Sequence, residues 1–186
     1  MTDSDNPDEA QQPPDPLVEA MEKHKGQLYW AVKSIARRVE INENGDITLL
    51  FIKYTVKVGN EGFKLIGQLK KLESLDATDS SITDAGAVPL AQLQQMRELI
   101  LDITALGDEG LPAISKLRSL KRLSLSATRV GDLGLKVIAK IRGLESLDLS
   151  GTNITHVGLE YLKPLSNLTH LDLGENGIRD DGMIHL

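Results

Sequence analysis

The sequence predicts a right-handed α/β solenoid, with a parallel sheet on its concave side and helices on its convex side. A pattern of leucines and glycines recurs every 24 residues without a gap. Each repeat has the residue order of a short strand, a turn and a helix. An irregular N-terminal segment precedes the repeats and predicts a helix and hairpin cap over the first of them.

Composition narrows the class of protein before any element is placed. The 186 residues include no cysteine, so we expect neither a disulfide framework nor a thiolate metal site. The sequence has no signal-peptide pattern and no apolar run near the roughly 20 residues that span a bilayer, which predicts a cytoplasmic protein without a membrane partner. Aromatic residues are only 3% and no basic face is evident, so we expect no nucleic-acid partner.

The N-terminal residues 1–16 are acidic and rich in proline, which predicts a disordered tail. This segment carries five of the six net negative charges, and the rest of the chain is therefore close to neutral. The acidity of the chain is mostly a property of this tail.

Residues 17–49 are predicted to form the cap. Helical spacing indicates a helix over 17–38, broken near Gly26, and the residues that follow read as a β-hairpin with a tight turn at Asn44-Gly45. The basic cluster of "KSIARR" then falls on the cap helix, where a solvated face is the simpler interpretation and contact with an anionic partner is the alternative.

Residues 50–186 contain the repeats, and "LKRLSLSATRVGDLGL" shows what each position does. Leu123 and Leu125 alternate with polar residues, so one strand face is buried. Thr128 lies where the chain leaves the strand, and its hydroxyl can bond to backbone of the turn. Asp132 is predicted to cap its own helix, and Gly134 to let the helix start approach neighbouring backbone.

The first repeat unit is irregular and allows two strand registers. An ungapped alignment would bury Lys53, whereas one extra residue buries Leu50 and Ile52 and aligns Thr55 with the turn threonines. We prefer the second register, because burial of an unpaired lysine is costly. A shift of one residue exchanges the two faces of a strand, so this register sends Phe51 to the concave side.

The end of the sequence leaves two interpretations open. No polar cap follows the last repeat, although Leu171, Leu173, Ile178 and Met183 are expected at its core. Either the sequence is a segment of a longer chain, or this C-terminal edge packs against a partner or a second copy.

The repeat pattern "LxxLxLxxTxVxDxGL" resembles the 24-residue leucine-rich repeats common in bacterial proteins, and is similar to the ribonuclease-inhibitor-like group. The resemblance covers about residues 69–186. It implies a leucine-rich-repeat solenoid, and it implies a non-catalytic protein-interaction module, because such repeats mostly serve as binding scaffolds.

The outward positions of the strands form three columns on the concave face, with neighbours about 4.8 Å apart. We predict that this face binds a protein or a basic or mixed peptide, with two apolar anchors among acidic side chains. A plain solvated sheet face is the alternative. The candidate residues are Phe51, Asp76, Glu98, Ile100, Asp102, Arg122, Asp148, His170 and Asp172.

The sequence carries no phosphate-binding loop, no nucleophile elbow and no cysteine, so we expect no enzyme activity and no cofactor. His170, Asp172 and Asp148 have the ligand types of a zinc or manganese site. A metal-dependent hydrolase on the concave face is therefore the least favoured alternative, after an assembly segment that uses the C-terminal edge.

Overall fold

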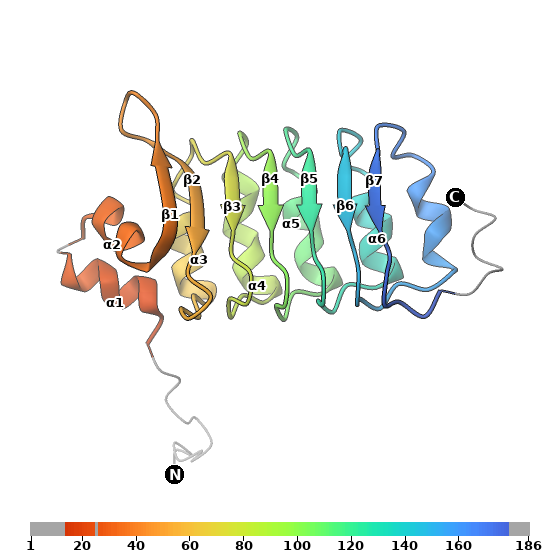
Figure 1. The fold of residues 1–186 in the computed structure, drawn as a ribbon, viewed down its shortest axis with the longest axis horizontal. Helices are drawn as coiled ribbons and strands as arrows, with labels where there is room; N and C mark the ends of the chain where they lie inside the picture. The colour runs from red at the N-terminus through yellow and green to blue at the C-terminus, as the bar shows by residue number, and fades with distance from the viewer. Residues whose placement is uncertain (1–13, 25, 179–186) are drawn as a thin grey trace, which may run out of the picture.

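The strands form one sheet whose order in space is the order in the chain (Figure 1). A computed structural model describes residues 14–24 and 26–178. Within them, β1 and β2 pair as an antiparallel hairpin, and every later strand adds in parallel to the one before it. The strands are β1 Ala36–Ile41, β2 Ile47–Ile52, β3 Ser74–Asp76, β4 Glu98–Ile100, β5 Arg122–Ser124, β6 Ser146–Asp148 and β7 His170–Asp172.

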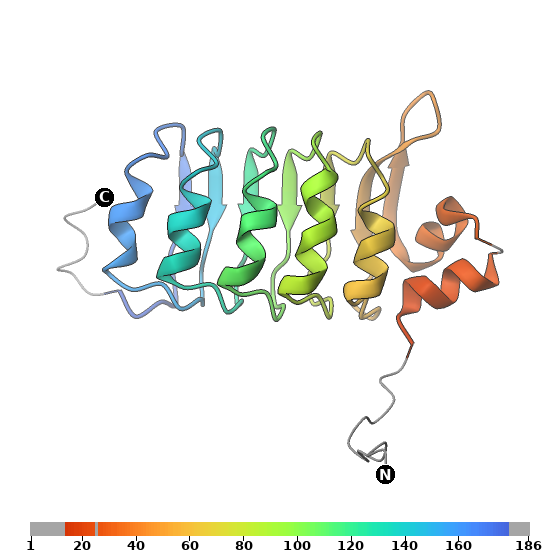
Figure 2. The same cartoon turned by 180° about the vertical axis from the view of Figure 1, so that it is seen from behind.

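The helices of the repeats cover one face of this sheet, and no helix of the described residues lies over the opposite face (Figures 1 and 2). This arrangement confirms the predicted α/β solenoid. The cap helices are α1 Pro16–Lys23 and α2 Leu28–Ile35. The repeat helices, with 3-10 turns marked η, are α3 Asn60–Ile66, α4 Asp84–Ala87, η1 Val88–Gln92, η2 Asp108–Gly110, α5 Leu111–Ile114, α6 Asp132–Ile138 and η3 Gly158–Leu162.

The core is a stack of leucines from successive strands. Leu75, Leu99, Leu123 and Leu147 are neighbours in register, and each is almost fully buried. Leu171, the next in the column, is only partly buried. Each repeat therefore buries its leucines mainly against the repeats on either side, as expected for a solenoid.

The turn threonines act as predicted. The side-chain hydroxyls of Thr104, Thr128 and Thr152 each donate to the carbonyl three residues earlier, at 2.7–2.8 Å. Ser80 occupies the same column, but among the described residues its buried hydroxyl has no hydrogen-bond partner. The column therefore satisfies backbone acceptors in three repeats and leaves one polar atom unsatisfied.

The predicted register of the first repeat is correct. Leu50 pairs with Leu75 and is fully buried, Ile52 is 2% exposed, and Phe51 pairs with Asp76 on the other face. The alignment of Thr55 with the turn threonines is wrong, because Thr55 is exposed in an irregular turn. The longer loop of this unit places its hydroxyl outside the sheet.

The cap differs from the prediction at its helix end. Helix α2 ends at Ile35 and β1 begins at Ala36, so Arg37 and Arg38 lie on the strand rather than on the cap helix. The cap also begins before its predicted first residue, 17, because helix α1 begins at Pro16 with the Asp15 side chain as its N-cap. The predicted boundary between helix and strand is therefore wrong, because the apolar positions here fit a helical and a strand pattern equally well.

The helix-start acids cap the following repeat, not their own helix. Asp84 Oδ1 accepts hydrogen bonds from the amides of Gly107 and Gly110 at 2.7 and 2.9 Å. Asp108 does the same for Gly131, and Asp132 for Thr155. The predicted role of Asp132 as the cap of its own helix is therefore wrong, since Gly131 holds that position.

The same contact explains the helix-start glycines. A Cβ at Gly110 would lie 2.8 Å from Asp84 Oδ1, and a Cβ at Gly134 would collide with Asp108 Oδ1. The close neighbour of Gly134 is therefore first a side-chain carboxylate of the previous repeat, rather than backbone as predicted. We call this series of contacts the capping ladder; its members are Asp15, Asn60, Asp84, Asp108 and Asp132.

Two further expectations concern the ends and the surface. Leu171, Leu173 and Ile178 pack only partly against the core, whereas Met183 lies outside the described residues. Across the described parts of the chain, none of the helices has the length and apolar character needed to cross a bilayer.

Candidate interaction surface

The candidate residues all come from the sheet face that no helix covers. Register pairs place Glu98 beside Arg122, Asp76 beside Ile100, and Asp148 beside Asp172. We call this surface the open sheet face; its sequence-predicted members are Phe51, Asp76, Glu98, Ile100, Asp102, Arg122, Asp148, His170 and Asp172. The strands therefore bring the predicted columns together as expected, while their binding role stays a prediction.

In the first column, neighbouring polar side chains partly satisfy one another. Glu98 accepts a 2.8 Å hydrogen bond from the Ser74 hydroxyl, and its other oxygen lies 3.4 Å from an Arg122 nitrogen. The Arg122 side chain is 68% exposed, so this ion pair contributes little to stability. Arg122 can therefore turn toward another partner at small cost.

The middle column contains three carboxylates that bond to the backbone where their strands end. Asp76, Asp148 and Asp172 each accept the backbone amide two residues later, at 2.8–3.0 Å. Short polar side chains at such turns commonly bond to their own backbone in this way. All of these hydrogen bonds end on Oδ1, so the second oxygen of each carboxylate points to no hydrogen-bond donor among the described residues.

Asp102 differs from its neighbours because it bonds across to the next repeat. Its Oδ1 accepts the Ser124 hydroxyl at 2.6 Å and the Ser126 amide at 2.9 Å. Burial raises the pKa of Asp102, the two hydrogen bonds lower it, and the carboxylates of Asp148 and Asp76 add to the rise. The net rise comes first from burial, with a smaller contribution from the neighbouring carboxylates.

The two predicted apolar anchors are half-buried rather than protruding. Phe51 lies on β2 with the Arg38 guanidinium 5.8 Å from its ring centre, and Ile100 lies between Asp76 and Ser124. A partner would meet a shallow apolar surface at these positions. Part of each side chain, Phe51 and Ile100, remains accessible next to the Asp76 carboxylate.

The residues considered for a metal do not form a cluster. Within residues 14–24 and 26–178, no three His, Cys, Asp or Glu side chains come together in a geometry that could hold an ion. His170 is exposed, and its Nδ1 lies 2.9 Å from the Thr169 hydroxyl. We therefore assign His170 only to the rim of the open sheet face.

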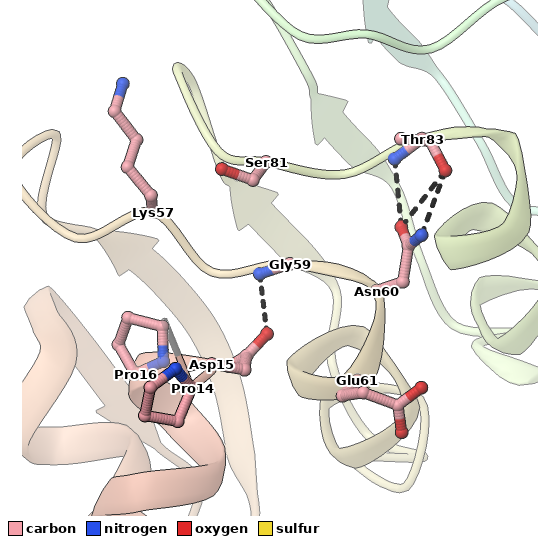
Figure 3. A pocket seen from close by; sticks show the side chains of 9 residues that line it. All are labelled: Pro14, Asp15, Pro16, Lys57, Gly59, Asn60, Glu61, Ser81 and Thr83. Carbon is pink, nitrogen blue, oxygen red and sulfur yellow. Dashed lines mark hydrogen bonds between the residues drawn. The ribbon is translucent and has the colours of Figure 1, made fainter. Parts of the chain in front are cut away.

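A depression of about 700 Å³ lies at the foot of the cap (Figure 3). Its polar groups serve the fold. Asp15 accepts the amide of Gly59, and Asn60 accepts the amide of Thr83 at 2.9 Å, which are two rungs of the capping ladder. The lining residues are Pro14, Asp15, Pro16, Lys57, Gly59, Asn60, Glu61, Ser81 and Thr83.

Sequence reasoning missed a column of left-handed residues just after the strands. Asp79, Ile103, Ala127 and Glu175 all have φ between 52° and 60°, and Gly151 has φ of 63°. The only sequence signal was the single glycine in that column, because most residue types avoid this conformation.

Comparisons with known proteins agree with this geometry. Residues 118–178 match the sequence model of the family described as leucine rich repeat. Over these residues the chain is similar to leucine-rich-repeat proteins, and the fold of the chain is the α/β solenoid of such proteins. The ribonuclease-inhibitor-like subgroup remains a prediction, and a search of curated proteins finds no match.

Two solved structures illustrate the likeness. An internalin from Listeria monocytogenes is similar over 66% of this chain, with 28% identity and a TM-score of 0.58. The matched part is 35% of that internalin, so this chain corresponds to about a third of its length. The second structure is the leucine-rich-repeat ectodomain of a plant membrane receptor kinase from Arabidopsis thaliana, solved in complex with CASPARIAN STRIP INTEGRITY FACTOR 2. The similar region is 72% of this chain and 16% of the receptor chain. At 18% identity and a TM-score of 0.50, this likeness shows similarity of fold alone.

Proposed function

We propose that this protein is a non-catalytic protein-interaction module whose open sheet face binds a basic segment of a protein or peptide. The leucine-rich-repeat fold supports the coarser part, because extended repeat surfaces are what such solenoids use for binding. The observation that carries the finer part is the row of carboxylates on one uncovered face. Among the described residues, no donor bonds to the second carboxylate oxygen of Asp76, Asp148 or Asp172.

The chemistry of the face favours lysine and arginine side chains. Asp102 lies between the charges of Asp76 and Asp148, and no cation of the described residues pairs with any of these three. A bound cation would offset the repulsion from Asp148 and Asp76, which adds to the effect of burial in raising the pKa of Asp102. Phe51 and Ile100 would add apolar contact to the same partner.

A matched neutralisation tests this proposal. In the triple variant Asp76→Asn, Asp148→Asn and Asp172→Asn, each side chain keeps an Oδ1 acceptor for its turn but loses its charge. Peptides selected from a random displayed library by the wild-type protein should be rich in Lys and Arg. Fluorescence anisotropy should show that the triple variant binds these peptides about tenfold or more weakly.

The control variant Glu109→Gln with Glu160→Gln removes two exposed acids away from the strands and should bind like wild type. Equal loss in both variants would indicate a general charge effect rather than a site. Selected peptides without basic residues would contradict the proposal.

A further inference from the structure

The cap carries a second surface, whose charge is opposite to that of the open sheet face. It gathers the exposed aromatic rings of Trp30 and Tyr54, which are 48% and 47% exposed, with three exposed cations. We call it the cap patch, and it consists of Trp30, Lys33, Arg37, Lys53 and Tyr54.

Direct contacts tie together the three segments that carry the cap patch, which are α2, β1 and the residues just after β2. Lys53 Nζ donates to the carbonyl of Ser34 at 2.9 Å, which ties the segment after β2 to the last turn of α2. Arg37 lies 5.6 Å from the ring centre of Tyr54 and donates to its hydroxyl at 3.3 Å. Lys33 lies 5.2 Å from the ring centre of Trp30.

A β-bulge places Arg37 in this patch. The pairing of β1 with β2 shifts register between Ala36 and Arg38, which leaves Arg37 unpaired between them. A bulge of this kind redirects one side chain out of the normal alternation. Arg38 contacts Phe51 on the open sheet face, whereas the bulged Arg37 contacts Tyr54.

The charges of the cap patch are not neutralised within the described residues. The elements α2, β1 and β2 contain one acid, Glu40, and it pairs with Arg38. Lys33, Arg37 and Lys53 have no carboxylate partner in the described parts of the chain. Cations stacked on aromatic rings form a surface that accepts carboxylates beside apolar groups.

We propose that the cap patch is a second docking site, which binds a short acidic segment of a partner protein. Carboxylates of the partner would pair with Lys33, Arg37 and Lys53, and an apolar side chain would lie on Trp30 and Tyr54. A long polyanion is disfavoured, because the adjoining open sheet face is lined by carboxylates that repel phosphates. The proposal does not depend on the open sheet face binding anything.

Trp30 makes the test direct, because it is the only tryptophan in the sequence. The probe is a synthetic peptide of alternating Glu and Leu, with an alternating Lys and Leu peptide and an oligothymidylate as comparisons. Titration of the full chain with the Glu peptide should change Trp30 fluorescence saturably. The affinity should fall as salt rises from about 0.05 M to about 0.5 M, since exposed charges are screened.

Charge reversal at the patch should abolish this signal while leaving the fold intact. The double variant Lys33→Glu with Arg37→Glu is expected to bind about tenfold or more weakly and to keep a wild-type melting temperature. The matched control Lys116→Glu with Arg118→Glu reverses two exposed cations elsewhere and should bind normally. The Asp76→Asn, Asp148→Asn, Asp172→Asn variant should also bind normally, which separates this proposal from the proposed function.

Three results would overturn the proposal. Tighter binding of the oligothymidylate than of the Glu peptide would assign the patch to nucleic acid. Equal loss of binding in the two charge-reversal variants would remove the site altogether. Binding only after neutralisation of the chain's own acids, by Asp3→Asn, Asp5→Asn, Asp8→Asn and Glu9→Gln, would assign the patch to the N-terminus of the same chain.

Discussion

Residues with positive φ follow the strands at the same place in successive repeats. Ile103 has φ of 56°, although β-branched residues rarely adopt this conformation. Its amide donates to the carbonyl of Ser126 at 2.8 Å, so the pairing of neighbouring repeats holds the strained backbone in place. The strain at this residue is therefore offset by a contact that exists only in the stacked solenoid.

Replacing Ile103 by glycine should stabilise the protein. The side chain is 57% exposed, so its loss costs little burial, and glycine accepts a positive φ without strain. We expect Ile103→Gly to raise the free energy of unfolding by about 0.5–1 kcal/mol, measured by urea denaturation. The reverse change Gly151→Ala, at the equivalent position with φ of 63°, should lower it; the opposite order would contradict the strain argument.

At the scale of elements, the capping ladder joins each repeat to the next. The carboxylate at the start of one helix accepts amides at the start of the following helix, as Asp84 does for Gly107 and Gly110. Asn60 uses an amide oxygen for the same purpose toward Thr83. An acceptor oxygen, rather than a negative charge, is therefore the common requirement of the ladder.

Asp84→Ala should lower the free energy of unfolding by about 1–2 kcal/mol, because two backbone amides lose their acceptor. Asp84→Asn should retain most of the stability, as Asn60 indicates. Thermal and urea denaturation of the two variants measure the difference. A loss in Asp84→Asn as large as in Asp84→Ala would show that charge, not the acceptor, stabilises the ladder.

At the scale of the whole molecule, stacking concentrates negative charge that no single repeat contains. Asp76, Asp102 and Asp148 come from three different repeats, and only the parallel register brings them to one face. The raised pKa of Asp102 records both its burial and these neighbours. The acidity of the open sheet face is thus a property of the assembled solenoid.

The raised pKa of Asp102 predicts that the stability of the protein depends on pH. The pKa of Asp102 is higher in the folded state than its ordinary value of 3.8, so the folded state binds the proton more tightly. The wild type therefore loses stability from Asp102 as pH rises from 3.8 through the raised pKa. Because the side chain is partly exposed, the penalty at neutral pH should be less than about 1 kcal/mol.

Asp102→Asn keeps the acceptor for Ser126 and removes the charge. Urea denaturation should show the variant more stable than wild type at neutral pH, with the difference shrinking as pH falls through the raised pKa toward 3.8. A difference that grows on acidification would have the wrong sign for a carboxyl group with a raised pKa.

The repeat, the buried leucines and the members of each strand column are predictable from local sequence patterns. Period-two alternation and the 24-residue spacing are local properties, and they specify which face each side chain occupies. The register of Leu50, Phe51 and Ile52 was also predictable, since the alternative would have buried Lys53.

The contacts between repeats and at the cap, in contrast, depend on how the chain packs in three dimensions. Asp132 was expected to cap its own helix, but stacking places its carboxylate against the Thr155 amide of the next repeat. The bulge that directs Arg37 to Tyr54 depends on how β1 pairs with β2, which no local pattern encodes. Side-chain type and spacing specify faces, whereas contacts between faces arise from packing over long sequence separations.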